Sequence, residues 1–145
     1  STLGTHFDYG DKASKDSVEQ QSCLPDFMVL MYPVISFTDS CCHTGSRDAL
    51  LGKNPPKEML NFYSNELQVK GDTPPTFLVH ADDDSGVPVE NSLLMYKALR
   101  AKKIPAEMHI LSEGEHGFGL ALNNNHVASW TNSLNLWLKS LNLKK

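Results

Sequence analysis

The 145-residue sequence has few cysteines, no excess of positive charge and no long apolar run. Its three cysteines, Cys23, Cys41 and Cys42, leave at least one thiol unpaired within the chain, which excludes a disulfide-stapled scaffold and leaves their redox state and the compartment open. The net charge of −4 argues against a nucleic acid or an anionic membrane as the partner. The longest apolar run, residues 27–32, is far shorter than the roughly 20 residues of a membrane-spanning helix.

The apolar content of the chain is sufficient for a packed core. Hydrophobic residues make up 40% of the sequence and charged residues 21%, which excludes wholesale disorder. The length suits one ordinary domain. The first ten residues, from Ser1 onward, contain neither the basic nor the apolar region of a signal peptide.

Short apolar strands alternate with helical segments along the chain. The patterns predict strands at residues 27–35, 76–81 and 106–112. They predict helices at residues 14–20, 47–51, 57–63, 88–103 and 127–143, the third of them opened by Pro56 and the last with an apolar stripe. This order predicts an α/β fold with three parallel strands and flanking helices.

Polar residues suited to proton transfer follow the second and third predicted strands. Asp82, Asp83 and Asp84 come directly after residues 76–81, and His116 lies in a glycine-rich turn after the third strand. Loops at the carboxyl ends of neighbouring parallel strands emerge on the same edge of a sheet, so an aspartate and this histidine can meet there. A carboxylate that accepts the Nδ1–H of an imidazole leaves the other ring nitrogen free to act as a base.

Metal binding is the alternative interpretation of two clusters. The acidic run Asp82–Asp84 does not fit a calcium loop, because Gly86 occupies the next ligand position. The adjacent residues Cys41, Cys42 and His43 lack the usual spacer between ligands, and no second ligand pair is evident. We therefore predict no metal site.

Several strings are the most distinctive features of the sequence: YPVIS, HTGSRDALLG, PPTFLVHADDDSGVPVENSLLMYKALR and GEHGFGLA. They resemble the C-terminal half of α/β-hydrolase esterases, and in particular the acetyl-xylan and feruloyl esterase-like carbohydrate esterases. The resemblance covers almost the whole chain, from about residue 1 to residue 143. Its most specific parts are GEHGFG and the pattern H-A-x-D-D-x-x-V-P-V.

The resemblance implies that residues 1–145 are the C-terminal part of a single α/β-hydrolase domain, without cofactor or metal. It places the catalytic acid at Asp84 and the catalytic base at His116, with Asp83 as the alternative acid. His43 and Arg47 are weak candidates for a substrate pocket, the alternative being a loop held by side-chain hydrogen bonds.

The chain contains no G-x-S-x-G motif, the usual signature of the nucleophile in this fold. Ser46 and Ser85 lack the flanking glycines and the strand-to-helix context. In the family, the nucleophile precedes the stretch that residues 1–7 resemble, so we expect it upstream of Ser1. The strand at residues 27–35 would then pair with the N-terminal half or with a second chain.

Three functions follow as hypotheses from the sequence. The first is a serine esterase acting on small-molecule or polysaccharide esters, such as the acetyl or feruloyl esters of plant polysaccharide. The second is a non-catalytic fragment or degenerate subunit, because the nucleophile is absent from the sequence. The third is a peptidase of the prolyl-oligopeptidase type, which shares the aspartate and histidine loops. The resemblance suggests a secreted or periplasmic protein.

Other conspicuous side chains are assigned to the core. His80 and His109 lie within predicted strands and are expected to have satisfied hydrogen bonds. Trp130 and Trp137 fall on the apolar stripe of the last helix, so we expect them to pack and not to bind sugar.

Overall fold

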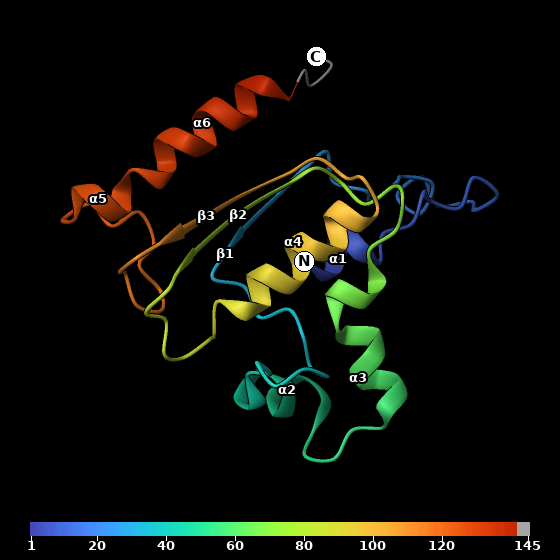
Figure 1. Cartoon of the computed structure of the whole chain (residues 1–145). Coiled ribbons are helices and arrows are strands. Elements are labelled where there is room, and N and C mark those ends of the chain that lie inside the picture. The colour runs from blue at the N-terminus through green and yellow to red at the C-terminus, as the bar shows by residue number, and fades with distance from the viewer. Residues whose placement is uncertain (142–145) are drawn as a thin grey trace.

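Three parallel strands form the centre of the computed structural model, which describes residues 1–141 (Figure 1). The strands are β1 (Met28–Met31), β2 (Thr76–Ala81) and β3 (Ala106–Leu111), in the sheet order β1-β2-β3. The middle strand, β2, is buried along its whole length. All three strands run in the same direction, so the loops that follow them leave from one edge of the sheet. The predicted parallel α/β architecture is confirmed.

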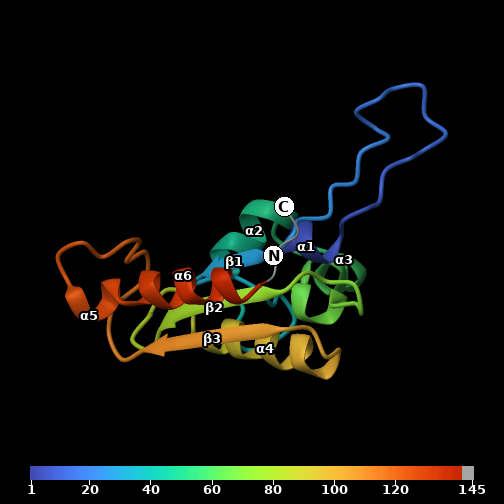
Figure 2. The same cartoon turned by 90° about the horizontal axis from the view of Figure 1, so that it is seen from above.

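Helices cover both faces of this sheet. In Figure 1, α4 (Glu90–Ala101) lies below the strands and α6 (Trp130–Ser140) lies above them. The remaining helical segments are α1 (Thr2–Thr5), α2 (Thr44–Leu51), α3 (Lys57–Tyr63), a short 3-10 helix (Asn65–Gln68) and α5 (Asn125–Ala128). Seen from above, the segment between α1 and β1 extends away from the body of the molecule (Figure 2). No helix within residues 1–141 is long and apolar enough to span a membrane.

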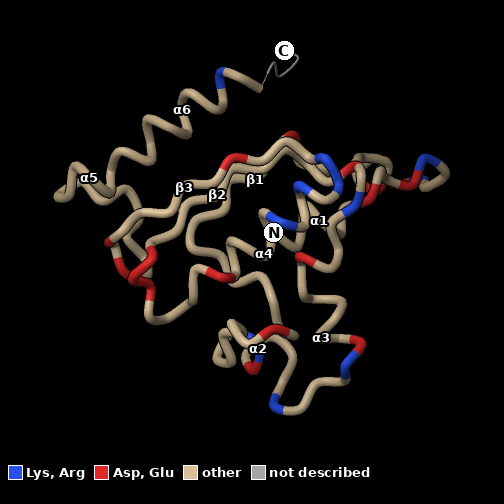
Figure 3. Tube along the Cα trace, viewed as in Figure 1, with Lys and Arg blue, Asp and Glu red and all other residues tan. Residues whose placement is uncertain are grey.

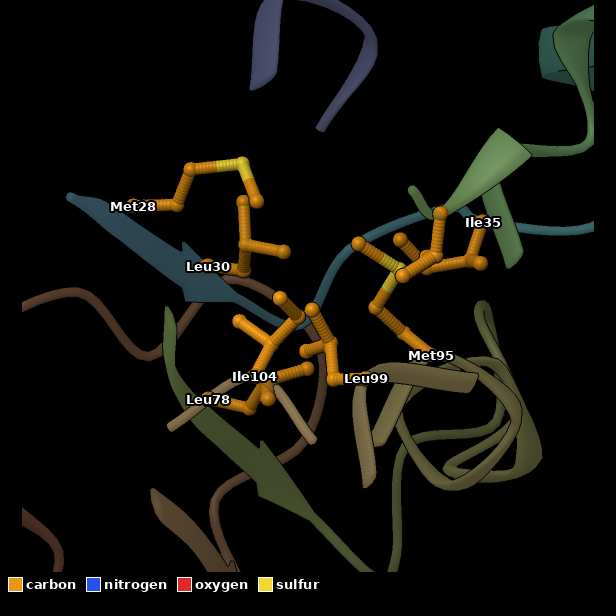
Figure 4. Close-up of a cluster of buried hydrophobic side chains, with 8 residues drawn as sticks. Met28, Leu30, Ile35, Leu78, Met95, Leu99 and Ile104 are labelled. Carbon is orange, nitrogen blue, oxygen red and sulfur yellow. The ribbon is translucent and has the colours of Figure 1, made fainter. Parts of the chain in front are cut away.

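Alternate residues of β2 supply two hydrophobic clusters, one on each face of the sheet. Leu78 faces α4 and packs in a cluster that includes Met95 and Leu99 (Figure 4). Phe77 and Val79 face the other way, and their cluster contains Val127, Trp130 and Trp137. The assignment of both tryptophans to the core is confirmed. Each fully buried large apolar side chain contributes roughly 1.5–3 kcal/mol, so the two clusters fix the strand that precedes the aspartate loop.

The helix predicted at residues 14–20 is wrong, because the structure has turns and bends there. The segment carries no apolar stripe that could pack on the core. Its polar side chains bind the local backbone instead. The Asp16 carboxylate accepts the N–H of Val18, and the Ser14 hydroxyl accepts the N–H of Asp16. Such local hydrogen bonds compete with helix formation.

Other predicted elements differ from the structure at their ends. The first strand ends at Met31, because Tyr32 adopts a φ of 37° and Pro33 cannot continue the ladder. The predicted helix at residues 57–63 has the bounds of α3, but Pro56 takes the cap position and not the first turn. The last predicted helix, residues 127–143, is divided into α5 and α6, and its final two residues lie outside the part of the chain that the structure describes.

Candidate active site

Asp84 and His116 meet at the carboxyl edge of the sheet. Asp84 follows β2 and His116 follows β3, in the loops that emerge side by side from these neighbouring strands. The Nδ1 atom of His116 lies 2.7 Å from Oδ2 of Asp84. A carboxylate can only accept, so an ionised Asp84 requires the proton of the neutral imidazole to be on Nδ1. The second nitrogen, Nε2, is then the basic one.

Asp84 is a buried carboxylate whose second oxygen is held by the backbone. The N–H groups of Gly86 and Val87 donate to Oδ1 at 2.9 and 2.8 Å, and the side chain is fully buried. Burial opposes ionisation, but the hydrogen bonds from Val87 and His116 outweigh it and lower the pKa of Asp84. The group is therefore a fixed anion that can orient an imidazole.

His116 lies on a turn that the sequence shapes with glycine. Gly114 and Gly117 have φ values of 149° and 86°, a region that side chains with a Cβ rarely adopt. A Cβ on Gly114 would also come within 3.2 Å of the Cβ of Ala81 at the end of β2. The turn thus brings His116 against the aspartate loop while 46% of the imidazole side chain stays exposed. A reacting group can therefore approach its outer nitrogen.

The neighbouring Asp83 does not contact the imidazole but ties the two loops together. Its carboxylate oxygens accept the backbone N–H of Gly114 at 3.2 Å and that of Glu115 at 2.8 Å. Adjacent aspartates thus have separate tasks here: Asp84 holds the His116 ring, and Asp83 holds the backbone that carries it.

Tyr32 is a part of this site that the sequence analysis missed. It follows β1 directly, and its ring makes edge-on contacts with His116 at 5.0 Å and with Phe118 at 4.9 Å between ring centroids. Its φ of 37° is strained for a residue with a Cβ. The rule that loops after parallel strands meet at one edge applies equally to β1 and provides the signal that could have found this residue.

The two weaker candidates from the sequence make their hydrogen bonds within the region of α2. His43 caps α2, because its Nδ1 accepts the backbone N–H of Ser46 at 3.2 Å and lies 2.9 Å from the Ser46 hydroxyl. Arg47 pairs with the adjacent Asp48 at 2.7 Å. These contacts match the alternative of a loop held by side-chain hydrogen bonds.

Acidic residues gather around the site, where β2 and β3 end (Figure 3). They are Asp82, Asp83, Asp84, Glu113 and Glu115. Within residues 1–141, no group of three or more histidine, cysteine or acidic side chains has the arrangement to hold a metal ion. Asp83 and Asp84 direct their carboxylates at backbone N–H groups and at His116, so these two are already engaged.

Asp84 and His80 make the folded state sensitive to acid. Burial lowers the pKa of His80, and the pKa of Asp84 is lowered as described above, so both bind protons more readily in the unfolded chain. Their stabilisation is complete above the unfolded pKa values, about 6.5 and about 4, and is lost as the pH falls through the folded ones. We expect the midpoint of thermal unfolding to decrease as the pH falls from 7 to 4, where His80 loses its contribution, and to decrease further below pH 4, where the loss should be smaller in Asp84→Asn. Equal pH dependence of the two proteins would contradict this.

Comparison with known proteins places the chain among hydrolases. The sequence profile of the prolyl oligopeptidase family matches residues 28–143. Endo-1,4-beta-xylanase B of Butyrivibrio fibrisolvens is 42% identical over 130 residues, which are 90% of this chain and 20% of the xylanase. Acetylxylan esterase of Xylanibacter ruminicola is 34% identical over 121 residues, 81% of this chain and 25% of the esterase.

A solved structure gives the same relationship. The acetyl ester-xyloside bifunctional hydrolase from Caldicellulosiruptor lactoaceticus superposes with a TM-score of 0.94 at 48% identity, over 97% of this chain and 51% of that one. The chain thus spans about a fifth to a quarter of the two curated relatives and half of this structure. The resemblance to carbohydrate esterases is confirmed at this level. The chain belongs to the prolyl oligopeptidase family and has the three-stranded part of an α/β-hydrolase fold.

Proposed function

We propose that this chain supplies the acid and the base of a serine ester hydrolase. The observation that carries the proposal is the 2.7 Å contact between a buried, ionised Asp84 and Nδ1 of the half-exposed His116, which leaves Nε2 as its basic nitrogen. The names of its relatives, acetylxylan esterase and acetyl ester-xyloside hydrolase, support ester chemistry. The nucleophilic serine is contributed by polypeptide that precedes Ser1 in the full-length protein, or by a second chain.

The proposed reaction divides the work between two side chains of this chain. Nε2 of His116 removes the proton of the serine hydroxyl as the oxygen attacks the ester carbonyl. The resulting imidazolium then gives that proton to the leaving alcohol, and an acyl-serine ester remains. Water, deprotonated by the same nitrogen, attacks this ester; as the intermediate collapses, the imidazolium gives the proton to the departing serine oxygen, which releases the carboxylic acid and restores both serine and neutral His116. Asp84 stays ionised throughout and stabilises the imidazolium through Nδ1–H.

The substrate that the relatives favour is an acetyl ester on plant polysaccharide. Two relatives carry acetyl ester or acetylxylan hydrolysis in their names, and a third is a xylanase. A feruloyl ester is the second member of the same class. The prolyl oligopeptidase family, to which the chain belongs, is named for peptidases, so a prolyl peptidase is the alternative candidate.

Substrate profiling of the full-length protein tests these alternatives. We expect hydrolysis of p-nitrophenyl acetate and release of acetate from acetylated xylan, with little cleavage of a proline p-nitroanilide. A fluorophosphonate probe is expected to label one serine and to abolish both activities. Faster cleavage of the anilide than of the esters would favour the peptidase, and inactivity on both would favour the non-catalytic alternative.

The ring of Tyr32 is expected to contribute to turnover by holding the His116 imidazole. Tyr32→Ala removes an edge-on aromatic contact worth about 0.5–1.5 kcal/mol, so kcat should fall up to about tenfold. Tyr32→Phe keeps the ring and is expected to retain most of the activity. Initial rates with p-nitrophenyl acetate measure both variants. Equal losses in the two would assign the effect to the hydroxyl group and contradict a role for the ring contact.

A further inference from the structure

A second histidine lies against the carboxylate that orients His116. His80 is the penultimate residue of β2, and none of its surface is exposed. Its Nε2 atom lies 2.9 Å from the carbonyl oxygen of Val87 and 3.2 Å from Oδ2 of Asp84. Its Nδ1 atom lies 2.7 Å from the hydroxyl oxygen of Ser92 in α4. The prediction that this histidine is a satisfied core residue is confirmed, but one of its partners belongs to the site.

The partners of His80 define the position of its proton. The carbonyl oxygen of Val87 and the ionised carboxylate of Asp84 both accept and cannot donate, so Nε2 must carry a hydrogen. In a neutral ring Nδ1 is then an acceptor, and the hydroxyl of Ser92 donates to it. Asp84 and His116 are the titratable groups that act on this imidazole, and burial lowers its pKa, which keeps it neutral.

Three hydrogen-bond donors surround the Asp84 carboxylate, and His80 is a fourth, more distant neighbour. The N–H groups of Gly86 and Val87 hold Oδ1, and His116, in the loop after β3, bonds to Oδ2. His80, in β2, bonds to the Val87 carbonyl with Nε2 3.2 Å from the same Oδ2, so its single N–H is shared between the two acceptors. The first two donors hold Oδ1 and, because the carboxylate is planar, already limit the rotation that would move Oδ2. The Nε2–H of His80, on the buried side of Oδ2 and on the rigid strand β2, adds a second restraint on the same group.

We propose that His80 is a positioning residue, whose Nε2–H holds Oδ2 of Asp84 in place for His116 at the end of a hydrogen-bonded chain from Ser92. This inference rests on the proposed function of the Asp84–His116 pair. His80 touches neither substrate nor nucleophile and acts only through Asp84. Removing its donor should lower kcat and leave KM almost unchanged, since the substrate-facing surface is the same.

Two substitutions at the same buried position separate positioning from packing. The amide nitrogen of glutamine lies as many bonds from Cβ as Nε2 does in histidine, so His80→Gln can donate to Val87 and Asp84. The amide of asparagine stops a bond short, so His80→Asn reaches toward Ser92 but not toward Asp84. Both variants lose the imidazole from the core, and both are expected to unfold at lower temperature. His109→Asn, on the neighbouring strand and bonded to Glu107, is the matched control.

The expected result, in the full-length protein assayed well below every unfolding midpoint, is a split between the two variants. His80→Asn should lose about 10- to 100-fold in kcat, the effect of one hydrogen bond to a charged group. His80→Gln should recover most of that loss, and His109→Asn should match the wild type. KM for p-nitrophenyl acetate should change less than about twofold in all three. Equal kcat in His80→Asn and His80→Gln would overturn the positioning role.

Nitrogen-15 NMR of the histidine-labelled protein tests the same inference without an activity assay. His80 should remain in the neutral Nε2–H form between about pH 5.5 and 8, where an ordinary histidine titrates. A neutral Nδ1–H form, or titration in that range, would overturn the inference. Its failure is distinguishable from failure of the proposed function. An inactive wild type, or a fully active His116→Ala, rejects the esterase, whereas a His116-dependent enzyme that is indifferent to the Asn and Gln variants rejects only the role of His80.

Discussion

Replacing His116 by alanine is expected to lower kcat for ester hydrolysis by about 10⁴- to 10⁶-fold in the full-length protein, the range seen when the base of such a triad is removed. Of the two histidines that contact the Asp84 carboxylate, His80 is buried, whereas 46% of the His116 side chain is exposed. Without it, the serine proton has no acceptor and the leaving alcohol has no donor. Substrate binding should change little, because the turn keeps its backbone contacts to Asp83.

The measurement is the initial rate with p-nitrophenyl acetate together with the unfolding midpoint of each protein. Because 46% of the His116 side chain is exposed, its removal should leave the midpoint close to that of the wild type. A folded His116→Ala protein with wild-type turnover would contradict the assignment of the base.

Asp84→Asn is expected to reduce kcat by about 10⁴-fold, because the amide imposes the wrong arrangement of hydrogens. Both carboxylate oxygens act as acceptors: Oδ1 from Gly86 and Val87, and Oδ2 from His116. An amide nitrogen in place of either oxygen would face donors. If the nitrogen faces His116, the imidazole must carry its proton on Nε2 and can no longer act as a base. If it faces the backbone, two N–H groups lose their acceptor.

The same mismatch should also destabilise the fold. A buried hydrogen-bond donor or acceptor without a partner lowers the stability of the fold by about 1–3 kcal/mol. The side chain of Asp84 is fully buried, so this cost applies to it. Rates at 25 °C and denaturant unfolding curves therefore need to be recorded on the same preparation. A folded Asp84→Asn protein that retains more than about a tenth of wild-type kcat would contradict this role, since each orientation of the amide breaks one side of the required hydrogen-bond arrangement.

The meeting of the two loops could be predicted because it depends on strand order alone. Two short apolar runs, each followed by a chemically distinctive loop, are sufficient to place Asp84 and His116 at one sheet edge once the strands are parallel. Part of the core could be predicted from the spacing of apolar residues along the last helix. Trp130 and Trp137 fall on an apolar stripe whose period matches a helix.

The division of work between Asp83 and Asp84 depends on turn geometry that residue types do not reveal. The two are chemically identical neighbours, and what separates them is which backbone N–H groups each one meets. Tyr32 was missed because its contact with His116 requires a φ of 37°, which a strand pattern does not predict. His80 has the signature of a core residue, and its contact with Asp84 arises from a turn that returns the chain toward β2.

The most direct test of the central claim, that Asp84 orients His116 for ester hydrolysis, is the ratio of kcat between Asp83→Asn and Asp84→Asn. Both substitutions remove the same charge from adjacent positions in one loop. Asp83 accepts two backbone hydrogen bonds at the surface, so its loss should cost at most about tenfold. Asp83→Asn should therefore be faster than Asp84→Asn by at least about 100-fold. A ratio near one, or a slower Asp83→Asn, would contradict it.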